Sequence, residues 1–210
     1  MAEQRALHEP FHEAERQEEA DRLGMLVFLG SEAMLFGGIF AVAMALRLLH
    51  PQDYIAASSQ MKLWHGTLNT AVLLTSSLMA ALAVEAARGG SPRWAGRALW
   101  SAVALGLLFL GIKGHEYWLE YREGAIPGLA NAHVGSAFEQ LFMNLYCAAT
   151  GLHALHLIGG MVLLAIAALK RSAREDRQAV LIGNVALYWH LVDLVWVFLY
   201  PTLYLAGAGQ

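Results

Sequence analysis

The sequence is poor in charge, in cysteine and in helix-breaking proline. Only 15% of its 210 residues are charged and 57% are apolar, an apolar share well above that of a soluble domain. A single cysteine excludes an intrachain disulfide and a CxxC redox or metal motif. The apolar runs contain no proline before Pro201, and no internal repeat is visible. This disfavours a transporter built from broken helices in inverted repeats.

Long apolar runs fill most of the chain. Four of them, each with at most one formal charge, exceed the roughly 20 residues that a helix needs to cross a bilayer. A fifth run, Ala98–Ile112, is shorter and is followed by Lys113 and Glu116. We predict an all-α integral membrane bundle of five transmembrane helices, with spans at about 24–47, 64–87, 97–119, 139–169 and 179–205.

The loop charges predict an orientation. If all five runs cross with the N-terminus inside, ten Lys and Arg residues fall in inside segments and four in outside segments. This bias indicates a cytoplasmic N-terminus and a periplasmic C-terminus. Residues 1–22, with seven acidic residues, form a predicted acidic cytoplasmic arm, and residues 23–207 form one domain. A mitochondrial presequence would be poor in acids, so we expect a bacterial plasma membrane. Lys113 and Glu116 would lie near the outer end of the third span, where long side chains reach water.

Polar side chains in the middle of the spans are the candidate functional residues. Glu32 is the one formal charge of its span, and it is either a functional buried carboxylate or a structural partner of a histidine or hydroxyl on another helix. His153 and His156 share a helix face, so they could bind metal or haem, or only hydrogen-bond to neighbours. With Asn69 and Ser31, they are the expected interhelical or lipid-site polar residues. We predict no metal site.

Four residues of the last span form a predicted partner interface. Asp193, Trp196 and Tyr200 fall on one stripe at i, i+3 and i+7, and such a mixture of polar and aromatic groups suits a protein contact more than lipid. His190 precedes Asp193 by three positions. The two are expected to form a local hydrogen-bonded pair or to contact a partner helix.

Five strings, one in each run, carry a family resemblance. They are GMLVFLGSEAMLFGG at 24–38, LNTAVLLTSSLMA at 68–80, LGIKGHEYWLEY at 110–121, ATGLHALHLIGG at 149–160 and YWHLVDLVWVFLY at 188–200. In this order they resemble subunit III of the haem–copper cytochrome c and quinol oxidases over residues 22–206. The resemblance implies an accessory subunit of a respiratory terminal oxidase, without catalytic residues or a cofactor of its own. Haem and copper would lie in partner subunits.

The resemblance also implies partners and roles. Glu32 matches the family's buried carboxylate in an SExxxF motif, and His153 and His156 match its HxxH. The subunit would pack against subunit I and stabilise it, bind phospholipid and support proton uptake during the reduction of oxygen to water. Subunit II and a small subunit IV are further expected partners, and nucleic acid is not. The long family form has seven helices, and this chain resembles a short form without the first two, which subunit I can supply.

Other functions remain open on the sequence. The accessory protein of nitric oxide reductase belongs to the same family, and the motifs do not separate it. From another class, a small proton or ion carrier could use Glu32 and the central histidines. A bis-His membrane cytochrome is the third alternative.

Overall fold

The protein is helical throughout the part that the structure describes. This computed structural model describes residues 14–59, 61–122, 136–170 and 175–207. Its helices are α1 (Ala14–Leu49), α2 (Pro51–Ser59), α3 (Leu63–Arg88), α4 (Pro92–Arg122), α5 (Ala137–Leu169) and α6 (Glu175–Leu203). Five of them are long and apolar enough to cross a membrane, which confirms the predicted all-α bundle. Residues 1–13 of the predicted arm lie outside the described residues, and α2 was not predicted.

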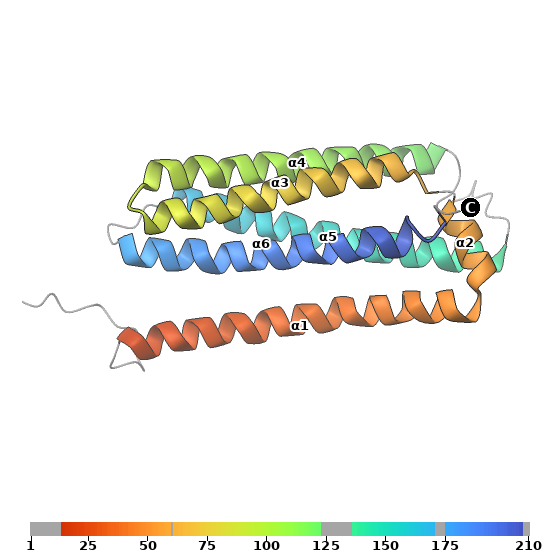
Figure 1. Ribbon diagram of the computed structural model, residues 1–210, viewed down its shortest axis with the longest axis horizontal. Coiled ribbons are helices and arrows are strands. Elements are labelled where there is room, and N and C mark those ends of the chain that lie inside the picture. The colour runs from red at the N-terminus through yellow and green to blue at the C-terminus, as the bar shows by residue number, and fades with distance from the viewer. Residues whose placement is uncertain (1–13, 60, 123–135, 171–174, 208–210) are drawn as a thin grey trace, which may run out of the picture.

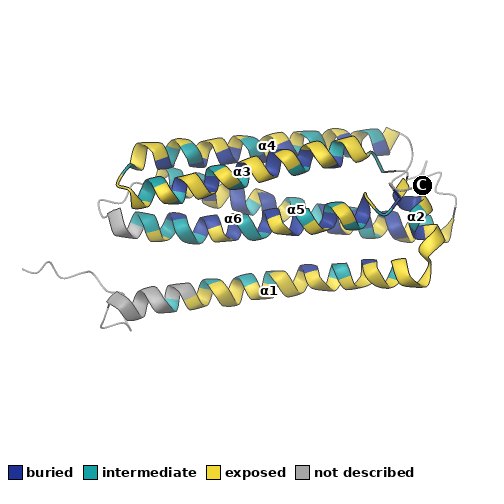
Figure 2. Ribbon diagram, viewed as in Figure 1, coloured by how far each residue is buried: buried dark blue, intermediate teal, exposed yellow. Residues whose placement is uncertain are grey.

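Four of the helices form a bundle and α1 lies beside it (Figure 1). In this bundle α3 packs against α4 and α6, and α5 packs against the same two helices. The first helix runs along α6 and α5, outside the bundle. Figure 2 shows buried residues on the inner faces of the four bundled helices, whereas α1 is exposed along most of its length. The chain therefore has one packed core, with α1 attached to its side.

Local sequence signals begin and end these helices. Ser136 and Glu139 form a capping box at the start of α5, in which each side chain accepts a hydrogen bond from the other residue's backbone N–H. At the end of α3, Gly90 adopts a φ of 67° and donates to the carbonyl of Ala87, while Ser91 donates to Ala86. This is a Schellman turn, which requires the left-handed conformation that glycine adopts at low cost. It sends the chain directly into α4.

Glycines make room for aromatic rings in the core. A Cβ atom on Gly160 would lie 2.8 Å from the ring of Trp189, and one on Gly106 would lie 3.0 Å from the same ring. A Cβ on Gly66 would lie 2.5 Å from the ring of Tyr200. Small residues in membrane helices generally allow close approach. Here they allow bulky side chains of α6 to enter the bundle.

The short helix α2 closes the end of the bundle at which α6 terminates. The last carbonyls of a helix have no partner within it. At the end of α6, Tyr54 donates to the carbonyl of Thr202 at 3.0 Å and Ser58 donates to that of Leu203 at 2.8 Å. The backbone N–H of Gly207 donates in turn to the Ser58 hydroxyl. Burial raises the pKa of Tyr54 to about 12, so its phenol keeps the proton that it donates.

Candidate functional site

A pair of titratable side chains joins α1 to the bundle. Glu32 on α1 and His156 on α5 meet with 2.7 Å between Oε2 and Nε2, and each side chain is 17% exposed. The other ring nitrogen of His156, Nδ1, lies 2.8 Å from the carbonyl oxygen of Leu152 one turn earlier. A histidine on another helix was one of the partners that the sequence allowed for Glu32, and in the structure this partner is His156.

This geometry fixes how many protons the pair holds. A carbonyl oxygen only accepts hydrogen bonds, so Nδ1 of His156 must carry a proton. The contact of Nε2 with Glu32 then needs one further proton, either on the imidazolium or on the carboxylic acid. The pair is neutral in both cases, which suits a site within a membrane span. Glu32 and His156 thus share one proton in the hydrogen bond between them.

Aromatic contacts support the pair on both sides. The ring of Phe36 packs edge-on against the imidazole of His156, with 5.2 Å between centroids. Phe28 packs against Tyr188 of α6, whose hydroxyl donates to the carbonyl oxygen of His156. Phe40 contacts Phe198 farther along α6. These contacts and the shared proton hold α1 at the seam between α5 and α6.

A second polar cluster is buried near the C-terminal end of α4. The ammonium of Lys113 donates to Glu116 at 3.1 Å, to the Tyr146 hydroxyl at 3.0 Å and to the Tyr204 hydroxyl at 2.6 Å. Tyr146 also donates to carboxylate oxygens of Glu116 and Glu120, and Tyr204 to Glu116. The exposed fractions of Lys113, Glu116 and Glu120 are only 4%, 1% and 7%. The prediction that Lys113 and Glu116 reach water at the end of the span is therefore wrong.

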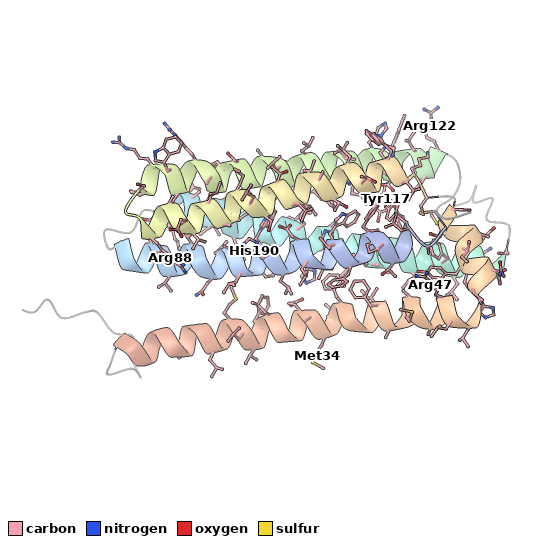
Figure 3. The ribbon with its side chains drawn as sticks, viewed as in Figure 1. Met34, Arg47, Arg88, Tyr117, Arg122 and His190 are labelled. Carbon is pink, nitrogen blue, oxygen red and sulfur yellow. The ribbon has the colours of Figure 1, made fainter. Side chains whose placement is uncertain are left out.

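Aromatic rings surround the buried ammonium. The Nζ atom of Lys113 lies 5.0 to 5.4 Å from the ring centroids of Tyr117, Tyr146, Trp196 and Tyr204. Tyr117 in turn hydrogen-bonds to Thr150 on α5. Cation–π attraction strengthens when a cation is removed from water. Figure 3 shows Tyr117 toward the end of the bundle at which Arg122 lies.

The sequence did not lead us to predict this cluster, although the spacing of its charged residues is consistent with one shared helix face. Lys113, Glu116 and Glu120 stand at i, i+3 and i+7 and therefore share one helix face. A charged face that continues an apolar run can point inward as well as toward water. The tyrosines that satisfy it come from α5 and from the residue just after α6, and no local pattern links them to α4.

Two of the predicted polar residues make no hydrogen bond between helices among the described residues. Ser31 is exposed and donates to the carbonyl of Phe28 in its own helix. Asn69 is fully buried, and its amide has no hydrogen-bond partner in the described part of the chain. Its neighbour Thr70 instead accepts a hydrogen bond from the indole N–H of Trp196. The interhelical role predicted at this depth thus belongs to Thr70.

The two histidines of the HxxH motif lie in different surroundings. His153 is 1% exposed, and its ring packs against Phe109 and Trp196 at 5.6 and 5.2 Å. His156 has both nitrogens engaged, with Glu32 and with a carbonyl. A bis-His haem site would need a free nitrogen on each ring. In the described residues no group of three or more His, Cys, Asp or Glu side chains is arranged to hold a metal ion.

The predicted stripe on α6 faces inward for most of its length. Asp193 and Trp196 are 3% and 0% exposed, so the prediction of a partner interface is wrong for these two residues. His190 hydrogen-bonds to the hydroxyl of Ser77 on α3 at 2.6 Å and not to Asp193, which corrects the predicted local pair. Tyr200 is partly buried and hydrogen-bonds to Thr67 on α3. The stripe therefore joins α6 to α3 and α4.

Comparison with known proteins identifies the family. A family model described as cytochrome c oxidase subunit III matches residues 11–208. The chain belongs to this family. As a cytochrome c oxidase subunit III family member, it is an accessory subunit of a respiratory haem–copper oxidase and a multi-pass membrane protein that works in a complex with other oxidase subunits.

Several relatives cover nearly the whole chain. Cytochrome c oxidase subunit 3 of Thermostichus vulcanus is 32% identical over 188 residues, 87% of this chain and 86% of that protein. Cytochrome c oxidase subunit 3 of Alkalihalophilus pseudofirmus is 31% identical over 192 residues, 89% and 87% of the two chains. A probable cytochrome c oxidase subunit 3 of Nocardia farcinica is 29% identical over 184 residues, 87% and 86%. The resemblance drawn from the five strings is confirmed.

The buried cluster gives a stability prediction. Replacing Lys113 by Met leaves Glu116 in a dry site without its cation, so we expect a loss of about 3–5 kcal/mol of stability. Thermal unfolding of the purified complex in detergent, followed by tryptophan fluorescence, measures this loss. Lys113→Met combined with Glu116→Gln should recover part of it, because the second change removes the unpaired charge.

Arg122→Gln is the matched control for this measurement. Arg122 lies on the same helix but is exposed, so its replacement should change stability by no more than about 0.5 kcal/mol. If Lys113→Met unfolds at the temperature of the unmodified complex, the cluster does not hold α4, α5 and the C-terminal segment together.

Proposed function

We propose that this subunit packs directly against oxidase subunit I, stabilises it and supports its proton uptake while oxygen is reduced to water. The observation that carries the proposal is the exposure of α1. Of the apolar stretch of 18 residues with which α1 could cross the membrane, only 6% is buried within the chain, against 50% of the corresponding stretch of α6. A membrane helix attached to its own subunit along one narrow edge has most of its surface left for another subunit or for lipid.

The outward face of α1 suits a second helix. Val27 and Met34 are 67% and 80% exposed, and Met34 points away from the bundle in Figure 3. Gly30, Gly37 and Gly38 lie on this side, and a Cβ atom on any of them would meet nothing within 4 Å. Small residues at a membrane interface let a partner helix approach closely. We assign this face to subunit I, with subunit II and a small subunit IV as further members of the complex.

The Glu32–His156 pair is the proposed functional element. It lies at the seam between α1 and the bundle, where each side chain keeps 17% of its surface accessible. A shared proton at such a place can be exchanged with a neighbouring path or can order a lipid beside the seam. The pair thus supports both proposed roles, proton uptake and phospholipid binding. The names of the relatives favour an oxidase over nitric oxide reductase as the surrounding complex.

We further propose that the chain lies in a bacterial plasma membrane with its N-terminus in the cytoplasm. Among the residues that the structure places, seven basic residues lie at the end where α1 begins: Arg16, Arg22, Arg88, Arg93, Arg97, Lys170 and Arg177. Four lie toward the opposite end: Arg47, Lys62, Lys113 and Arg122, of which Figure 3 labels Arg47 and Arg122. The bias of basic residues toward one end supports this orientation.

The orientation predicts the location of the C-terminus. An alkaline phosphatase fused after Gln210 should be active, because the C-terminus would lie in the periplasm. A fusion in the connection after Arg88 should be inactive while a fluorescent reporter at the same site is visible. An inactive but expressed fusion at Gln210 would contradict the proposed orientation.

The exposed face of α1 predicts an assembly defect. Gly37→Leu should leave this subunit folded in the membrane, because no atom of the chain lies where the new side chain begins. It should reduce the amount of haem-containing subunit that copurifies in mild detergent several-fold, since a partner helix could no longer approach. Met34→Leu on the same face keeps the volume and is the control. Full copurification with Gly37→Leu would mean that this face meets lipid.

The shared proton predicts a defect in sustained turnover. Glu32→Gln keeps a hydrogen bond to His156, because the amide can donate to a neutral Nε2, but it removes the transferable proton. We expect normal assembly, normal haem content and a near-normal initial rate of oxygen reduction, followed by inactivation several-fold faster during repeated turnover. Glu32→Ala should be worse, because it also removes the contact with α5.

Two further variants sharpen this test. Glu85→Gln, at an exposed carboxylate near the end of α3, should behave as the unmodified complex. His156→Gln should resemble Glu32→Gln, because either change removes the same proton. A Glu32→Gln complex with an unchanged turnover lifetime would reduce the pair to a structural contact.

A further inference from the structure

A cavity at the basic end of the bundle lies apart from the Glu32–His156 pair. It has a volume of about 680 Å³ and opens where α4 begins, α5 ends and α6 begins. Its lining includes Arg93, Arg97, Trp100 and Ser101 of α4, with Ala168 of α5 and Gln178 of α6. This volume lies in the range of small-molecule sites. The first helix packs mainly on α5 and α6, and none of its described residues lines the cavity.

Two arginines give this cavity its charge. Arg93 and Arg97 stand at i and i+4 and therefore lie one above the other on α4. Neither forms an ion pair with a carboxylate in the described part of the chain, and like charges at this spacing repel. The guanidinium of Arg97 also stacks 5.0 Å from the ring centroid of Trp94. An anion between the two guanidiniums would relieve the repulsion and could accept several charge-assisted hydrogen bonds.

The position of the cavity indicates the kind of anion. It lies at the first turns of a membrane span, the depth at which lipid phosphates and tryptophan side chains meet water. Below the arginines the same face of α4 becomes apolar, with Trp100 and Leu108 47% and 50% exposed. A free phosphate would use only the charged part of this surface. A lipid would use both parts, the phosphodiester at the arginines and its acyl chains along Trp100 and Leu108.

We propose that this cavity binds the phosphodiester headgroup of an anionic phospholipid. Basic pockets between membrane helices suit such headgroups, and each arginine near an anionic membrane surface strengthens binding several-fold. The amide of Gln178 offers a neutral donor to the glycerol part of the headgroup, whereas the hydroxyl of Ser101 donates to the carbonyl of Arg97 and can only accept. This site does not depend on the role proposed for Glu32, which lies on another helix and in the middle of its span.

The test compares lipid retention by variants of the intact oxidase complex. The complex is purified in mild detergent, exchanged into vesicles of phosphatidylcholine with a small fraction of phosphatidylglycerol or diphosphatidylglycerol, and its bound lipids are measured by native mass spectrometry. We expect retention of the anionic lipid and not of phosphatidylcholine. Arg93→Gln with Arg97→Gln should weaken this retention on the order of tenfold or more. Gly96→Leu should weaken it similarly without a charge change, because a Cβ at Gly96 meets nothing within 4 Å and the side chain would fill the cavity.

Arg122→Gln provides the matched control. Arg122 also stacks on a tryptophan of α4, 4.8 Å from the ring of Trp118, but at the opposite end of the helix. Its replacement should leave lipid retention unchanged, and haem content reports on assembly for every variant. Unchanged retention in both the double arginine variant and Gly96→Leu would overturn the proposal. Displacement of the lipid by millimolar inorganic phosphate would also overturn it, in favour of a free-anion site. Loss of a subunit without loss of lipid would show that a protein partner fills the cavity.

Discussion

The burial of the Lys113 ammonium is the constraint on which the rest of the bundle depends. A cation can stay in the interior of a membrane protein only if every donor is satisfied and an opposite charge is near. Glu116 supplies the charge, and Tyr146 and Tyr204 supply oxygens from α5 and from the end of the chain. One side chain thus joins three segments, and their relative positions cannot change without exposing or orphaning a charge.

The burial of Lys113 also explains the structure at the end of the bundle where α6 terminates. Tyr204 must reach back to Lys113, so the chain after α6 folds against the bundle and does not continue outward. The short helix α2 then covers that segment through Tyr54 and Ser58, whose hydroxyls donate to the final carbonyls of α6. The four-helix core is closed at this end by hydrogen bonds as well as by apolar packing.

The other four long helices form the packed bundle, so most of the surface of α1 remains exposed and can contact another molecule. A hydrogen bond between Glu32 and His156 and three aromatic contacts connect α1 to the bundle along one edge, and its other faces are exposed. For an accessory subunit of an oxidase this division is useful. The bundle forms the packed core, while α1 carries the face that we propose contacts subunit I and the carboxylate that shares a proton with His156. At the opposite end of the bundle, the arginines of α4 face a cavity and lack carboxylate partners in the described residues.

The sequence by itself determined the class of the protein, its five spans and its family, because apolar length and ordered motifs are local properties. It also offered a histidine or hydroxyl on another helix as one of two interpretations of Glu32. The tertiary structure alone decided which partner, since His153 and His156 stand three residues apart and only the packing of α1 on α5 selects His156. Likewise, the spacing of Lys113, Glu116 and Glu120 defines a charged face but not its direction. That face points inward because Tyr146 and Tyr204, distant in the chain, offer it hydrogen bonds that lipid cannot.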